Sequence, residues 1–245
     1  MWDFVSQHNH SPLLSKQLKE PLFNVPFIII FLIVFCFFSY IIPQYFLSDQ
    51  LYIRSLILFS FIPVFFQTEP LMFCYTIVSY SFMHGSFGHI AMNMVWLLVF
   101  GSPLAKHFGN LRFLFFWTLT AGISALTYFI FHRDSMIPLV GASGTISGMM
   151  GAITRYGFFS VFNSNMCNKR FLGPVWTIKK ALRSKTVLIY IGVWLIVNCL
   201  TGIFPYLFGD SDILIAWEAH VGGLISGFIL ISFFDSSWKR SKINV

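Results

Sequence analysis

The chain has 245 residues, of which 56% are hydrophobic and 10% are charged, and its mean hydropathy is +0.74. Soluble globular domains carry about 25% charged residues, so this composition excludes an ordinary cytosolic, fibrous or disordered protein and indicates an integral membrane protein. The formal net charge of +7 would suggest nucleic acid in a soluble protein, but in a membrane protein the placement of basic residues reflects topology.

Six apolar stretches follow one another along the chain. They cover about residues 22 to 42, 87 to 105, 112 to 131, 143 to 161, 187 to 207 and 213 to 234. Each is near the length of about 20 residues that a helix needs to cross a hydrocarbon core of roughly 30 Å. The sequence therefore predicts an all-α, polytopic membrane protein with six transmembrane helices.

The segment 1–21 lacks the charged-then-apolar pattern and the small-residue cleavage site of a secretory signal. We therefore expect the first span to be retained. The predicted organisation is a cytoplasmic N-terminal segment at 1–21, one membrane domain at 22–235 and a basic cytoplasmic tail at 236–245.

The loop after the first span contains a further apolar run, Leu56 to Phe66. This run has only 11 residues and includes Pro63, so it is too short to cross a membrane as a helix. We expect one interfacial or re-entrant element here, within a membrane-associated first outer loop.

The basic residues predict the orientation of the six spans. With a cytoplasmic N-terminus, 14 Lys and Arg fall on inner segments, and only Arg54 and Arg133 fall outside. This asymmetry places both termini in the cytoplasm and suits a bacterial inner membrane, with an organellar membrane as the alternative. We expect the lipid bilayer as a partner and no nucleic acid, whereas the oligomeric state is open.

The four cysteines show no CxxC or CxxH spacing, so we expect neither a zinc site nor a disulfide framework. They are interpreted as packing residues. No metal and no cofactor is expected.

Polar residues inside the predicted spans mark candidate sites, because lipid makes them costly. At the start of the second span, His84 is followed by His89 and Asn93. His89 and Asn93 are four positions apart, so they share a helix face and can direct two donors at one point.

The fourth and sixth predicted spans carry the other two clusters. Gly141-Ala-Ser143-Gly144 begins the fourth, and the sixth contains His220, Gly223 and Gly227 at positions i, i+3 and i+7. Glycines at this spacing let two helices approach closely, and Gly144 and Gly148 offer a matching face. We therefore expect the two spans to touch.

Contact between these spans would place Ser143 beside His220. A serine hydroxyl needs an adjacent base to become a nucleophile, and histidine titrates near neutrality. Because no carboxylate lies mid-membrane nearby, the sequence predicts a Ser-His dyad without one. His89, Asn93 and the backbone N–H of Ser143 are the candidate donors for a developing oxyanion.

The three motifs together resemble the rhomboid family of intramembrane serine proteases. They read H-x4-H-x3-N from His84, G-x-S-G from Gly141 and A-H-x2-G-x3-G from Ala219. The resemblance implies a six-helix rhomboid-like bundle without a cofactor that cleaves single-pass transmembrane protein substrates. It also implies that Ser143 is the nucleophile, that His220 is the base and acid, and that His84 shapes the site.

One position departs from the family pattern. Members usually carry an aromatic residue four positions after the nucleophile, packed on the catalytic imidazole, and this chain has Ser147 there. We expect either another aromatic side chain, such as Trp217, to hold His220, or a looser imidazole and lower activity.

Each motif also has a structural interpretation. A G-x-S-G turn, a histidine on a glycine-rich face and an Asn-His pair all serve as helix contacts in membrane proteins. Their coincidence in order and membrane depth favours the protease. The alternative is a catalytically weak or inactive rhomboid-like protein that binds transmembrane helices. A transporter would predict inverted repeats and paired intramembrane carboxylates, which are not seen; the role of Glu218 stays open.

Overall fold

The structure is a computed structural model that describes residues 25–157, 174–203 and 215–235. These residues form helices, and the only β-pairing among them is an isolated antiparallel bridge between Phe61 and Leu139. The predicted all-α class is therefore confirmed. The segments 1–21 and 236–245 lie outside the described residues.

Within these described ranges, five helices are long and apolar enough to cross a membrane. These candidate spans are α1 (Phe27–Phe46), the continuous helix Phe87–Phe108, α8 (Asn110–Phe131), α11 (Lys185–Ile203) and α12 (Trp217–Phe234). The second span combines α6 (Phe87–Trp96), a π-helical turn η2 (Leu97–Gly101) and α7 (Ser102–Phe108). The integral membrane character read from composition agrees with these helices.

The predicted count of six spans is not reached among the described residues, because α9 (Ser143–Thr154) has only 12 residues. At 1.5 Å per residue it is about 18 Å long, against a hydrocarbon core of roughly 30 Å. Every residue of α9 after Ser143 is buried. Apolar composition here reflects packing inside the protein, which hydropathy does not distinguish from contact with lipid.

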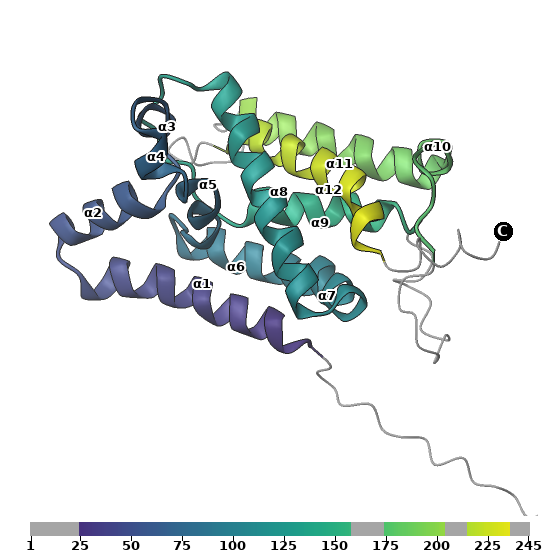
Figure 1. The fold of residues 1–245 in the computed structure, drawn as a ribbon, viewed down its shortest axis with the longest axis horizontal. Coiled ribbons are helices and arrows are strands. Elements are labelled where there is room, and N and C mark those ends of the chain that lie inside the picture. The colour runs from purple at the N-terminus through teal and green to yellow at the C-terminus, as the bar shows by residue number, and fades with distance from the viewer. Residues whose placement is uncertain (1–24, 158–173, 204–214, 236–245) are drawn as a thin grey trace, which may run out of the picture.

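The first loop contains several short helices, and the run Leu56 to Phe66, which was predicted to form one element, spans parts of two of them. The short helices are α2 (Asp49–Phe59), α3 (Pro63–Thr68), α4 (Pro70–Phe73), α5 (Thr76–Ser79) and a 3₁₀ turn η1 (Tyr80–Phe82). The run Leu56 to Phe66 is divided because Pro63, which has no N–H, starts a new helix. Helix α2 buries no residue and extends away from the bundle (Figure 1). Membrane association of this loop stays a prediction.

Helix α12 packs on α9 and α8 and less extensively on α11; it lies beside α11 in Figure 1. Its contact with α9 is a seam of glycines. A Cβ atom added at Gly223 would collide with the carbonyl of Gly144, and one added at Gly227 with the carbonyl of Gly148. The predicted contact between these two segments is therefore present, and it brings the two backbones together because neither helix has side chains in the way.

A buried arginine closes the other end of this seam. Arg155 follows α9, and its guanidinium donates hydrogen bonds to the carbonyl of Trp176 at 2.8 Å, the carbonyl of Phe228 at 2.7 Å and the hydroxyl of Ser232 at 3.0 Å. One side chain thus joins α9, α12 and the segment that precedes α10 (Ile178–Ala181).

Candidate active site

Ser143 is the first residue of α9, and the segment before it is held by the first loop. Leu139 exchanges two backbone hydrogen bonds with Phe61, and the N–H of Gly141 donates to the carbonyl of Tyr80 at 3.0 Å. Gly141 has a φ of 112°, in the region that favours glycine. The chain therefore turns sharply into α9, whose first N–H groups have no acceptor within the helix.

His220 lies in the first turns of α12, directly across the glycine seam from Ser143. The Ser143 hydroxyl Oγ is 2.7 Å from Nε2 of His220. Ser124 on α8 supports this register, because its hydroxyl donates to the carbonyl of Ala219 at 2.5 Å. The structure therefore brings together the two residues of the predicted dyad.

The other ring nitrogen of His220 contacts a residue that the sequence motifs did not identify. Nδ1 lies 2.6 Å from Oδ1 of Asn198 on α11. The amide Nδ2 of Asn198 donates to the backbone carbonyl of Trp217 at 3.1 Å. The amide of Asn198 in an apolar span was the available signal, but no spacing links Asn198 to His220, because they lie on different helices.

His89 and Asn93 both face the turn that precedes Ser143. A Cβ atom added at Gly141 would lie 2.6 Å from Nε2 of His89 and 3.5 Å from Nδ2 of Asn93. Nδ2 of Asn93 is buried and has no hydrogen-bond partner among the described residues. Unsatisfied buried donors are rare in proteins, so this amide is available to an oxygen atom that enters beside Ser143.

His84 supports this group from behind. Its ring packs edge-on against the ring of His89, with 5.2 Å between centroids, and its Nδ1 lies 3.3 Å from the carbonyl of Phe82. Burial, reinforced by the neighbouring His89, lowers the pKa of His84 from 6.5 to about 3. A neutral His84 therefore packs against the His89 ring at physiological pH, and the shaping role of His84 stays a prediction.

Comparisons with known proteins identify the family of this chain. The family model of the rhomboid domain matches residues 73–236, which include all three motifs. The chain belongs to the rhomboid family. It is 27% identical to RHOMBOID-like protein 6, mitochondrial, of Arabidopsis thaliana over 171 residues, which are 68% of this chain and 47% of that protein.

Two other Arabidopsis thaliana relatives match at similar levels. RHOMBOID-like protein 4 is 26% identical over 63% of this chain and 32% of its own length, and RHOMBOID-like protein 5 is 26% identical over 63% of this chain and 42% of its own length. The matches therefore span less than half of each of these relatives.

The rhomboid position that usually holds an aromatic residue is occupied differently here. The hydroxyl of Ser147 donates to the carbonyl of Ser143 at 2.8 Å, within its own helix. Among the described residues, no ring contact to His220 is found. The expectation that the Trp217 ring holds the imidazole is not met, since Trp217 contributes its backbone carbonyl through Asn198.

Two histidines each pair with a carboxylate at the ends of helices. His132, at the end of α8, lies 3.0 Å from Glu218, and His107 lies 3.1 Å from Asp235. Glu218 is in the first turn of α12, where a carboxylate is favourable. These pairs tie α8 and α7 to the two ends of α12.

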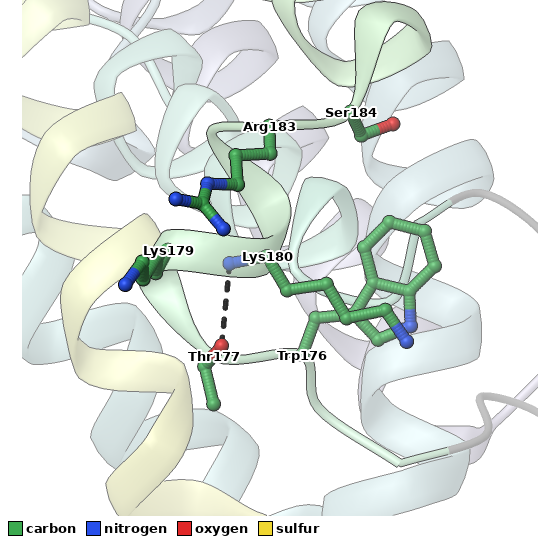
Figure 2. Close-up of a pocket in the computed structure, with 6 residues that line it drawn as sticks. All are labelled: Trp176, Thr177, Lys179, Lys180, Arg183 and Ser184. Carbon is green, nitrogen blue, oxygen red and sulfur yellow. Dashed lines mark hydrogen bonds between the residues drawn. The ribbon is translucent and has the colours of Figure 1, made fainter.

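A separate hollow of about 520 Å³ surrounds α10, away from the dyad. Figure 2 shows its basic side chains, with Lys179 and Lys180 extending in opposite directions. The ammonium of Lys180 lies over the Trp176 ring, 4.5 Å from its centroid. Because these cations do not converge on one point, we assign no ligand to this hollow.

Proposed function

We propose that this rhomboid protein is an intramembrane serine endopeptidase that cleaves single-pass transmembrane substrates. The observation that carries the proposal is the 2.7 Å hydrogen bond between Ser143 Oγ and His220 Nε2. A hydroxyl held by an unprotonated imidazole is the arrangement that nucleophilic attack on a peptide carbonyl requires.

In the proposed reaction, Ser143 Oγ attacks the scissile carbonyl carbon while His220 Nε2 accepts its proton. The C–N bond then breaks, the imidazolium returns the proton to the leaving amine, and an ester to Ser143 remains. A water molecule, deprotonated by His220, hydrolyses this ester and regenerates the hydroxyl. One peptide bond and one water become one carboxylate and one amine.

The developing oxyanion lies beside Gly141 in this scheme. Its donors are Nδ2 of Asn93, the N–H of Ser143 and Nε2 of His89 in the tautomer that carries its hydrogen on Nε2. The N-terminus of α9 adds a favourable dipole. The orphaned amide of Asn93 supports this role, because the transition state would supply its missing partner.

The proposed orientation follows from the basic residues of the sequence. With both termini in the cytoplasm, the first residues of α6, α9 and α12 lie toward the outer face, and cleavage occurs in the outer part of the bilayer. We place the protein in a bacterial inner membrane on the same basis. Labelling of single cysteines introduced at Arg133 and Lys179, with a membrane-impermeant reagent on intact cells, tests this: only the first is expected to react.

The test of function is cleavage of a model single-span substrate by purified protein in liposomes. We expect the parent to cleave the substrate and to react with a fluorophosphonate at Ser143. Ser143→Ala and His220→Ala should each lose at least 10³-fold in rate, whereas Ser147→Ala should retain activity because Ser147 bonds only to its own helix.

Retention of cleavage by Ser143→Ala would contradict the proposed nucleophile. A second candidate function is capture of transmembrane helices without cleavage, and the serine at the usual aromatic position is the feature that favours it. A folded parent that binds the substrate helix but neither cleaves it nor reacts with the fluorophosphonate would support this second function.

A further inference from the structure

We propose that Asn198 is a positioning residue for the general base, and that it makes the orientation of His220 depend on the docking of α11. This inference rests on the proposed function. It starts from the relay Ser143–His220–Asn198–Trp217, whose three hydrogen bonds measure 2.7, 2.6 and 3.1 Å.

The relay fixes the amide of Asn198. The carbonyl of Trp217 can only accept a hydrogen bond, so the group that faces it must be the NH₂ of the amide. The opposite orientation would bring two oxygen atoms together and would point the NH₂ at the His220 ring. Oδ1 is therefore the atom that faces Nδ1 of His220.

The fixed amide in turn fixes the tautomer of His220. Since Oδ1 is an acceptor, Nδ1 must carry the proton and donate it, which leaves the lone pair of Nε2 directed at the Ser143 hydroxyl. This is the tautomer that acts as a base. Asn198 thus holds the ring plane and selects the competent tautomer without contacting the reacting atoms.

The helix that supplies Asn198 is weakly attached to the bundle. Of the 19 residues of α11, only Val187 and Asn198 are buried. One turn after Asn198, Gly202 faces the Trp217 ring, and a Cβ atom added there would lie 2.6 Å from its Cδ1 atom. The outer half of α11 therefore docks on α12 through this amide and this glycine, and displacement of α11 would remove the support of the base.

The experiment compares Asn198→Leu, Asn198→Asp and Gly202→Ala with the parent, using Val197→Ala as the control because Val197 is exposed on the same helix. We expect Asn198→Leu to lower kcat by about 10- to 100-fold with little change in KM, as losses of partners that orient an imidazole do in metal sites. Gly202→Ala should also lower kcat, because it disturbs the docking of α11 on α12. Val197→Ala should leave kcat unchanged.

A pH profile separates positioning from a general packing defect. Asn198→Asp restores an acceptor for Nδ1 and adds a negative charge that stabilises the imidazolium. Its kcat should exceed that of Asn198→Leu, and its acid limb should move to higher pH, because the base becomes protonated earlier as the pH falls. Among the described residues, the other ionisable groups that bear on His220 are His89 on α6 and Glu218, two positions earlier on α12 and bonded to His132. All variants retain them.

Failure of the proposed role of Asn198 can be distinguished from failure of the proposed Ser143–His220 dyad. Ser143→Ala and His220→Ala establish whether the dyad cleaves at all. If they abolish cleavage while Asn198→Leu keeps kcat within about twofold of the parent and leaves the pH profile unchanged, the positioning role is wrong. Equal losses in Asn198→Leu and Asn198→Asp, accompanied by equal losses of thermal stability, would likewise overturn it.

Discussion

Individual side chains in the site combine burial with unmet hydrogen-bonding capacity. The amide of Asn93 has no partner for Nδ2, and His84 has none for Nε2, among the described residues. A buried polar group without a partner costs about 1–3 kcal/mol. Side chains placed at such a cost are candidates for function, and the two lie on either side of His89 in the chain.

At Asn93 this predicts opposite effects on stability and activity. Replacement by Leu removes the buried, unpartnered amide, so Asn93→Leu should melt at the temperature of the parent or above it. Its kcat should fall by about 10²-fold, because one oxyanion donor is lost. Thermal unfolding in detergent and kcat in liposomes measure the two effects, and a variant that loses both together would point to a structural role for the amide.

At His84 the lowered pKa predicts an acid-sensitive contribution to stability. The unfolded side chain takes up a proton near pH 6.5, whereas the folded one does so near pH 3. Stability is therefore lost as the pH falls from 6.5 toward 3. In His84→Gln the drop in melting temperature over this interval should be smaller, and an identical pH dependence in parent and variant would argue against the shift.

At the scale of whole helices, some contacts can be predicted from the sequence and others cannot. The contact of α9 with α12 was predictable because the spacing of the glycines can be read within each segment of the sequence. The shortness of α9 was not, since its small apolar residues read as lipid-facing when they are buried in protein. The partner of His220 was also missed, because Asn198 belongs to a helix whose rotation and depth only the assembled bundle determines.

The close packing at the glycine seam predicts that substitution of a single seam glycine by a larger residue destabilises the fold. Gly227→Ala would drive its Cβ into the carbonyl of Gly148 and should destabilise the fold by roughly 1–3 kcal/mol. Because the seam also sets the distance between Ser143 and His220, fluorophosphonate labelling should fall as well. Gly192→Ala is the matched control, since a Cβ atom there meets nothing within 4 Å. Equal melting temperatures and labelling rates in the two variants would rule out tight packing at the seam.

At the scale of the whole molecule, the bundle is joined at two ends of α12. The relay around His220 lies at its start, and Arg155 binds near its end through Phe228 and Ser232. The arginine is 2% exposed, and its planar fork satisfies three acceptors at once. Lysine does not reproduce this geometry.

Arg155→Lys should therefore lower the stability of the whole bundle, by on the order of 2 kcal/mol, while the dyad itself is unchanged. The expected result is a lower melting temperature with near-parental labelling of Ser143 well below that temperature. Arg112→Lys, on the exposed first turn of α8, is the conservative control. Loss of labelling without a change in melting temperature would contradict a purely structural role for Arg155.

The same arginine has a consequence for biosynthesis. Helix α9 emerges from the ribosome before α12, yet Gly144 and Gly148 pack on α12, and two of the three acceptors of the Arg155 guanidinium also lie on α12. Until the last span has been inserted, the 12-residue helix α9 lacks the surface on which it packs, and the guanidinium of Arg155 lacks two of its three acceptors. Chains truncated before Trp217 should consequently be recognised by membrane quality control, so the final span determines whether the nascent protein survives.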